Sequence, residues 1–398
     1  MPLVLLDLDG TLADPGGGIT AAMAHALGAM GAPTPDEEAL RRWVGPPLSH
    51  AFAALLPDPT PDAVSRAVAI YRARFERVGL AAARAYPGIT DLLGAMTERG
   101  WTLWVVTFKS RQHAVSVTER LGIAPHLAGV TGASPEGPSD KPALIASILA
   151  REGVDPADAV VVGDRRHDVE GARANGAAAL GVTWGFGSKS ELERAGTDWL
   201  CDAPDEGLRI LDAWFAGPLP SSRAEILHWR RLPRERPARI ETPGAAAESC
   251  WSYPRPPRLA EEARPLRIEH AGNTLADTRR ALRVLETASP PTYYIPRSDV
   301  ADALLEPDAS RSLCEWKGAA RYWRLRGAPD ALPVAWSYPA PFPGFEALQD
   351  HLAFFASRVH ACYVGDERAR PQPGGFYGGW ITDDVTGPFK GMPGSERW

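Results

Sequence analysis

Cysteine is scarce in this chain of 398 residues, and its cysteines lie far apart. Cys201, Cys250, Cys314 and Cys362 show no paired spacing. Zinc sites and disulfide frameworks use closely patterned cysteines, so neither is indicated here. No basic segment precedes the first short apolar run, so we see no signal peptide. Together these features predict a cytoplasmic protein.

Long apolar runs and a strong excess of one charge are also missing. No stretch is long and apolar enough to span a bilayer. The net charge is −6, which does not indicate nucleic acid binding by charge. With 44% hydrophobic and 23% charged residues, the composition is that of an ordinary soluble protein. We therefore expect neither a membrane nor a nucleic acid among its partners.

Lysine is the third scarce residue. Lys and Arg together number 43, and the lysines among them are Lys109, Lys141, Lys189, Lys317 and Lys390. An ammonium is a compact point charge, whereas a guanidinium is a planar fork. A chain that so rarely uses lysine has reason to keep one where an ammonium is needed.

The most informative stretch lies at the N-terminus, where the apolar run 3–6 ends in Asp7, Asp9 and Gly10. The run predicts a buried strand of a parallel sheet, and ligands bind at the carboxyl ends of such strands. Asp7 and Asp9 point the same way because their spacing is two, and Gly10 permits a sharp turn. A buried strand followed by an acidic turn is the alternative interpretation.

Three further groups repeat this pattern later in the chain. Thr107 ends a predicted strand at 101–107, and Lys141 opens a predicted helix at 143–152. Asp164 and Asp168 follow the apolar strand 159–162. Taken singly, Thr107 could cap a helix and Lys141 could be an exposed surface lysine. Lysine at a helix start opposes the helix dipole, which suggests a purpose for Lys141.

In this order, Asp7-Leu8-Asp9-Gly10-Thr11-Leu12 and the three later groups resemble the motifs of the haloacid-dehalogenase-like phosphatases. The resemblance covers about residues 1–215. It implies an α/β fold, with a Rossmann-like parallel sheet and a helical cap at about 13–85. It implies Mg²⁺ as cofactor, held by Asp7, the backbone carbonyl of Asp9, Asp164 and Asp168. The catalytic residues it implies are Asp7, Asp9, Thr107 and Lys141.

Smaller features bear on which subclass of these phosphatases the chain resembles. Gly45-Pro46-Pro47-Leu48 is similar to a turn in the caps of phosphoglycolate-phosphatase-like and 5′-nucleotidase-like members, and Thr107-x-Lys109 matches a nucleotidase-like pattern. Phe108 departs from the small polar residue of many relatives. The resemblance implies hydrolysis of a small phosphomonoester through an aspartyl-phosphate, and the exact substrate stays open. We expect substrate contacts at Lys109, Gly45 and Arg165.

The second half of the chain differs in character. Residues 216–247 are rich in Pro and Arg and predict a linker. Residues 248–398 predict a mainly-β domain, with one helix at 344–355 and a hairpin turn at Ala271-Gly272. The strands are expected at 266–270, 273–277, 283–287, 292–295, 321–325 and 359–364.

This second domain resembles a bacterial domain family of unknown function, which some classifications label nucleotidyltransferase-like. The resemblance rests on Glu248-Ser249-x-Trp251-x-Tyr253-Pro254, Cys314-x-Trp316-Lys317-Gly318 and the glycine-rich run 372–380. No Gly-Ser with spaced aspartates is present, so that activity is not transferred. An aromatic pocket for a flat anion and a plain aromatic core are equally good interpretations of Trp251, Trp316, Lys317, Trp336, Tyr377 and Trp380.

Three functions are compatible with these observations. The first is a Mg²⁺-dependent phosphatase, acting on a small phosphorylated metabolite and carrying a C-terminal accessory or ligand-binding domain. The second is a ligand-sensing protein that uses the phosphatase half as a scaffold. The third is a bifunctional enzyme with a separate C-terminal activity. The oligomeric state is open, with a homodimer among the options.

Overall fold

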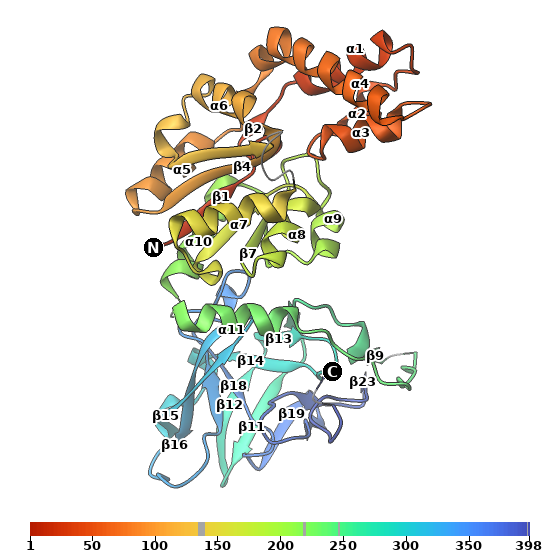
Figure 1. The fold of residues 1–398 in the computed structure, drawn as a ribbon. Helices are drawn as coiled ribbons and strands as arrows, with labels where there is room; N and C mark the ends of the chain where they lie inside the picture. Colours follow the sequence, from red (N-terminus) through yellow and green to blue (C-terminus); the bar gives the residue numbers. More distant parts are fainter. Residues whose placement is uncertain (134–139, 218–219, 246, 396) are drawn as a thin grey trace. The chain divides into compact units, whose positions relative to one another are not determined.

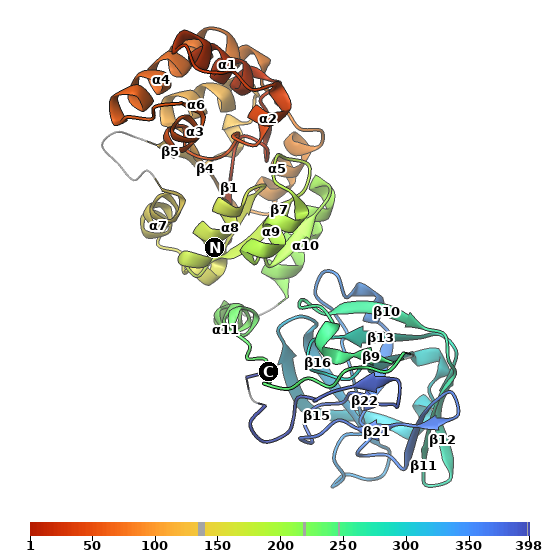
Figure 2. The same ribbon diagram turned by 90° about the vertical axis from the view of Figure 1, so that its right-hand side faces the viewer.

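The computed structural model describes residues 1–133, 140–217, 220–245, 247–395 and 397–398. The chain divides into two compact units, 1–227 and 228–398 (Figures 1 and 2). Within the part of the chain that the structure describes, no helix has both the length and the apolar character needed to cross a membrane.

A six-stranded parallel sheet forms the centre of the first unit, which confirms the predicted α/β fold. The strand order is β5-β4-β1-β6-β7-β8. Strands β1, β6 and β7 are buried along their whole length, as expected for a sheet covered on both faces. The strands are β1 (Leu3–Leu6), β4 (Thr102–Ser110), β5 (Gly129–Ala133), β6 (Ala159–Gly163), β7 (Ala178–Val182) and β8 (Trp199–Cys201).

Helices connect these strands and pack on the sheet. Leu144, Ile145 and Ile148 on one helix bury their side chains against Leu5 and Val161 of the sheet. The spacing of three and four residues places all three leucine and isoleucine side chains on one helix face. The helices are α5 (Ile89–Glu98), α6 (Arg111–Arg120), α7 (Lys141–Glu152), α8 (Arg166–Ala174), α9 (Lys189–Ala195) and α10 (Pro204–Ala216).

A helical insert separates β1 from the rest of the sheet. It is joined to the core by two short paired strands, β2 (Ala13–Asp14) and β3 (Arg84–Ala85). The insert has an apolar core of its own, which includes Phe52, Tyr71 and Phe75. Its helices are α1 (Gly18–Ala29), α2 (Glu37–Arg41), α3 (Leu48–Leu55) and α4 (Pro61–Arg74), followed by a π-helical turn, Phe75–Gly79. Figure 1 shows α1 to α4 grouped together, and we call residues 13–85 the cap.

The second unit is built mainly from antiparallel strands, which confirms the predicted mainly-β domain. Its larger sheet contains, in order, β10 (Arg258–Glu262), β13 (Ala281–Leu285), β14 (Thr292–Pro296), β18 (His351–Phe354), β17 (Ala335–Ser337), β16 (Gly318–Leu325) and β15 (Leu305–Cys314). Its smaller sheet contains β12 (Asn273–Thr278), β11 (Leu266–His270), β19 (Ala361–Val364) and β20 (Glu367–Arg368). Two short pairs remain, β9 (Glu248–Ser249) with β23 (Val385–Thr386) and β21 (Arg370–Pro371) with β22 (Trp380–Ile381).

The strands of the larger sheet bury side chains on both faces. Tyr293 belongs to a core shared with the smaller sheet, whereas its neighbour Tyr294 packs in a second cluster with Trp316 and Trp336. This alternation follows from the two-residue period of a strand. The hairpin turn at Ala271-Gly272 joins β11 to β12 as predicted, and both residues have positive φ, 49° and 78°.

The helix predicted at 344–355 is wrong. A short 3₁₀ turn, Glu346–Leu348, is followed by strand β18. Leu352 faces one core and Ala353 faces the other, so the period of this apolar run is two rather than 3.6. The stretch 216–247, predicted to be a linker, contains helix α11 (Pro220–Arg231). Residues 218–219 and 246 of that stretch lie outside the described residues.

Candidate active site

Two neighbouring parallel strands, β1 and β6, position the carboxylates of Asp7 and Asp164. Leu6 of β1 lies opposite Val162 of β6, and the Asp7 N–H donates to the Val162 carbonyl at 2.9 Å. Asp7 therefore leaves the end of β1, and Asp164 follows the last residue of β6. Because carboxyl ends of parallel strands meet at one edge of the sheet, residues 157 positions apart in the sequence become neighbours.

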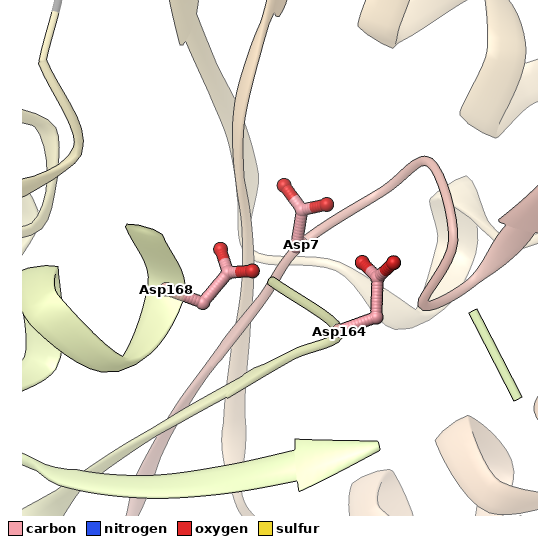
Figure 3. A group of neighbouring side chains, drawn as sticks. All are labelled: Asp7, Asp164 and Asp168. Atoms are coloured by element: carbon pink, nitrogen blue, oxygen red, sulfur yellow. The ribbon is translucent and has the colours of Figure 1, made fainter. Parts of the chain in front are cut away.

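Asp168 joins them from the first turn of α8. Figure 3 shows Asp7, Asp164 and Asp168 grouped around one point, and one oxygen of each lies within 4.8 Å of the other two. All three side chains are buried. The Phe186 N–H donates to Asp164 Oδ2 at 2.7 Å, and the Arg165 N–H donates to Asp168 Oδ2 at 3.1 Å. These backbone donors hold two of the three carboxylates in place.

The close approach of these carboxylates changes their acidity. Burial raises the pKa of Asp7 well above its usual value; the charge of Lys141 opposes this shift, and the charges of Asp168 and Asp164 add to it. Burial, followed by the charge of Asp168, raises the pKa of Asp164 to about 7. A site of this kind is stabilised by additional positive charge.

Lys141 supplies part of that positive charge. Its Nζ lies 2.6 Å from Asp7 Oδ1 and 2.7 Å from Asp168 Oδ1, and it donates to the Val106 carbonyl at 2.8 Å. Burial lowers the pKa of Lys141, but Asp168 and Asp7 outweigh this effect and the net shift is upward. Asp140 caps α7 by accepting from the Ala143 N–H at 2.8 Å, which fixes the helix start from which Lys141 projects.

Gly10 allows the acidic loop to pass close to Asp164. Its φ is +94°, and a Cβ at this position would lie 2.4 Å from Asp164 Oδ2. Both the left-handed backbone and the lack of space therefore exclude a side chain. The Thr11 hydroxyl, one residue later, donates to Asp164 Oδ1 at 3.3 Å.

Asp9 and Thr107 lie beside the three carboxylates and are linked by Lys109. Lys109 Nζ is 2.8 Å from Asp9 Oδ2, and the Lys109 N–H donates to Thr107 Oγ1 at 3.1 Å. The same ammonium lies 4.2 Å from the centre of the Phe75 ring, which belongs to the cap. Lys109 therefore contacts both the acidic loop and the cap.

A cavity of about 590 Å³ opens over these groups. The core contributes Asp7, Asp9, Thr107, Lys109 and Lys141 to its lining, which brings the four predicted catalytic residues to one place. The cap contributes the aromatic rings of Trp43, Tyr71 and Phe75, and β4 contributes the ring of Phe108.

The cap residues of this cavity were not predicted from the sequence. Tyr71 and Phe75 are four residues apart on one helical face, and their rings stack with centroids 5.8 Å apart at 10°. Their spacing was a usable signal, but it indicates equally well a buried helix face. His167 also lines the cavity, and its ring meets the Phe108 ring edge-on with the centroids 5.7 Å apart.

Of the predicted substrate-binding residues, Lys109 and Gly45 line the cavity. Arg165 is not part of the lining; its guanidinium donates to the Val44 carbonyl of the cap and pairs with Glu191 at 3.0 Å. A Cβ on Gly45 would lie 2.9 Å from Arg165 Cγ, so the cap backbone passes directly over this arginine.

Comparison with known proteins agrees with this geometry. Residues 4–182 match the haloacid dehalogenase-like hydrolase family. A 5′-nucleotidase of Pseudomonas aeruginosa is 38% identical over 192 residues, which are 48% of this chain and 86% of that protein. The chain belongs to the haloacid dehalogenase-like hydrolase family.

Other relatives of this hydrolase differ in their names. The tyrosine-protein kinase PtkA of Mycobacterium tuberculosis is 35% identical over 196 residues, 49% of this chain and 66% of that protein. The crystal structure of a predicted phosphatase from Clostridium acetobutylicum superposes with a TM-score of 0.50 at 32% identity, covering 52% of this chain and 96% of that one. The hydrolase belongs to the phosphoric monoester hydrolases.

The C-terminal unit of the hydrolase matches a second family, a domain of unknown function (DUF427), over residues 258–365. The structure does not bring the six C-terminal site residues into one place. Trp316 and Trp336 share one apolar cluster, Trp251 belongs to another, and Trp380 belongs to a third. Trp380 is fully buried and donates to the Phe354 carbonyl at 2.9 Å, which is the behaviour of a core residue.

Proposed function

We propose that this hydrolase cleaves a small phosphomonoester with Mg²⁺ and with Asp7 as the nucleophile. The observation that carries the proposal is the buried group of Asp7, Asp164 and Asp168, with Lys141 placed between two of them at the floor of a cavity. Phosphoryl transfer needs positioning and neutralisation of negative charge more than it needs covalent chemistry. This group of residues provides both.

The carboxylate group suits Mg²⁺ in its chemistry. Asp7, Asp164 and Asp168 offer hard oxygen ligands, all buried and within 4.8 Å of one another. We propose that they hold the ion, together with the backbone carbonyl of Asp9. When bound, Mg²⁺ would neutralise charge and orient the phosphate.

Two steps follow from the positions of Asp7 and Asp9. A carboxylate oxygen of Asp7 attacks phosphorus, the new P–O bond forms, and the ester P–O bond breaks while Asp9 donates a proton to the leaving oxygen. A water molecule then gives its proton to Asp9 and attacks phosphorus, which breaks the bond to Asp7 and releases phosphate. Lys141 and Thr107 would bind the phosphate oxygens during both steps.

The cavity lining favours a substrate with a flat ring. Trp43, Tyr71, Phe75 and Phe108 surround a space of about 590 Å³, which is far more than phosphoglycolate requires. Aromatic walls are suited to stacking against a ring. We therefore propose a nucleoside monophosphate as the preferred class, with Lys109 and Gly45 contacting it and Arg165 holding the cap over it.

The test is phosphate release by the full chain with and without Mg²⁺. The panel contains nucleoside monophosphates, sugar phosphates and phosphoglycolate, and Asp7→Asn is the matched variant because it removes only the nucleophilic charge. We expect turnover that needs Mg²⁺, is fastest on nucleoside monophosphates, and is lost in Asp7→Asn. Equal release by both proteins on every substrate would contradict the proposal.

The relative named as a tyrosine-protein kinase defines a second arm of this test. Transfer of the phosphoryl group to a tyrosine instead of water would label the acceptor and release no inorganic phosphate. An assay with γ-labelled ATP and a tyrosine peptide separates the two outcomes. We expect release to water, because we assign Asp9 to activate a water molecule.

For the C-terminal unit we propose an accessory, ligand-binding role in the cytoplasm. The described cysteines are all free, which suits a reducing compartment.

A ligand-sensing protein without phosphatase activity would bind its ligand in the C-terminal unit and would release no phosphate in the assay. A bifunctional enzyme would pass that assay and show a second reaction that survives in Asp7→Asn. A homodimer is tested by light scattering.

A further inference from the structure

A group of charged side chains in the second unit has more cations than carboxylates. We call it the charged cluster; its members are Arg234, Arg255, Lys317, Lys390, Glu286 and Glu315. They come from segments far apart in the sequence, including the stretch after α11, the turn between β15 and β16, and the C-terminal stretch. All are buried or half-buried, so water screens these charges poorly.

The carboxylates are shared among several cations. Arg255 lies 3.1 Å from both Glu286 and Glu315. Arg234 is 3.8 Å from Glu315, and Lys317 is 4.0 Å from Glu286, which is at the limit of an ion pair. Arg255 therefore has good partners, whereas the other pairings are long.

Lys390 has no carboxylate within 4.0 Å among the described residues, and its ammonium lies 5.4 Å from the centre of the Tyr377 ring. Burial and then the charge of Arg234 lower the pKa of Lys390, with Glu286 acting in the opposite direction. Burial and then the charge of Arg255 lower the pKa of Arg234. The cations of the cluster thus repel one another.

Lys317 is the most buried member, with 8% of its surface exposed. Burial lowers the pKa of Lys317, but the neighbouring Cys314, Tyr294 and Glu286 outweigh this effect and the net shift is upward, so its ammonium stays charged. The six members contain four cations and two carboxylates, and an anionic ligand would balance this excess of cations.

We propose that the charged cluster binds the phosphate group of a small molecule. A phosphate monoester carries close to two negative charges at neutral pH, so it would balance an excess of cations. Arg234 offers guanidinium N–H donors for phosphate oxygens and Lys390 offers a point charge, whereas Arg255 is already engaged by Glu286 and Glu315. Arg234 also donates to the Trp398 oxygen at 3.3 Å.

The chain's few lysines make this site directly testable. The full chain is treated with an amine-acylating reagent, and the modification rate of each lysine is read by mass spectrometry. The probe is inorganic phosphate, compared with sodium chloride at equal ionic strength. We expect phosphate to slow the modification of Lys390 several-fold and to leave the exposed Lys189 unchanged. Because each lysine is read separately, binding at Asp7 and Lys141 does not confuse the result.

Two variants complete the experiment. Arg234→Gln removes one fork, and we expect phosphate to lose its protection of Lys390. Arg279→Gln removes an exposed arginine outside the cluster, and we expect protection to persist. A parallel series with glycerol phosphate shows whether the site accepts a phosphate ester as well as free phosphate. Lys390 reacting equally fast in phosphate and in chloride, or full protection in Arg234→Gln, would overturn the proposal.

Discussion

Single residues decide how closely the acidic groups approach one another, and Gly10 is the clearest case. Gly10→Ala should cost about 1–2 kcal/mol in the free energy of unfolding from its left-handed backbone alone. The new Cβ would also displace Asp164, whose Oδ2 it meets at 2.4 Å. We expect the rise in melting temperature caused by Mg²⁺ to shrink in this variant, as measured by thermal unfolding.

Gly28→Ala is the matched control for that change. Gly28 lies in α1, is exposed, and a Cβ there would meet nothing within 4 Å. Alanine in a helix should stabilise the protein by about 0.5–1 kcal/mol. If Gly10→Ala responds to Mg²⁺ as fully as Gly28→Ala does, Gly10 does not position Asp164 for the ion.

Lys141 is the second residue whose replacement has a defined consequence. Lys141→Met removes the ammonium from between Asp7 and Asp168 and leaves two buried carboxylates uncompensated. Breaking a buried ion pair in this way costs about 3–5 kcal/mol. We expect that loss in urea unfolding without Mg²⁺ and a partial recovery with it. Lys189→Met, on an exposed lysine, should change stability by less than about 0.5 kcal/mol.

At the scale of elements, the start of α7 connects helix capping to catalysis. Asp140→Ala removes the side-chain acceptor of the Ala143 N–H and should cost about 1 kcal/mol. Because Lys141 directly follows the N-cap residue Asp140, we also expect slower phosphate release. Asp140→Asn should keep both the stability and the rate of phosphate release of the original protein, since asparagine is an equally good N-cap residue.

Asp36→Ala tests whether the loss of any helix N-cap would slow phosphate release. Asp36 caps α2 with the same geometry, accepting from the Ala39 N–H at 2.8 Å. We expect a similar loss of stability but unchanged phosphate release. A fall in release as large as that of Asp140→Ala would show that capping as such, rather than the position of Lys141, controls the rate.

Elements were predicted well where one periodicity dominated. The apolar runs of β1 and β6 and the helix α7 lie within a few residues of their predicted bounds. The helix predicted at 344–355 is wrong because Leu352 and Ala353 are both apolar, so the run does not show which face is buried. Two cores on opposite faces of one strand produce such a run.

At the scale of the whole molecule, the two units have separate cores, so they should unfold in separate transitions. We expect calorimetry to resolve two transitions and Mg²⁺ to raise the temperature of only one. Trp380→Phe leaves the Phe354 carbonyl without its donor and should cost about 1–2 kcal/mol in the free energy of unfolding. We expect this loss to lower the midpoint of only the other transition, by a few degrees. A single transition that responds to both changes would show that the units unfold together.

The sequence by itself determined the strand ends that carry Asp7, Asp9 and Asp164, because local periodicity and the geometry of parallel sheets are sufficient for that step. The order of Thr107, Lys141 and Asp168 along the chain then indicated the family. These are properties of short segments, and short segments are what a pattern can report.

Only the tertiary structure decided which distant groups meet. It placed Lys141 between Asp7 and Asp168, brought Phe75 of the cap onto Lys109, and assigned Trp316 and Trp380 to different cores. The charged cluster likewise exists only in the folded chain. Each of these contacts joins segments that are far apart in the sequence, so packing of the whole unit, rather than any local pattern, selects the partner.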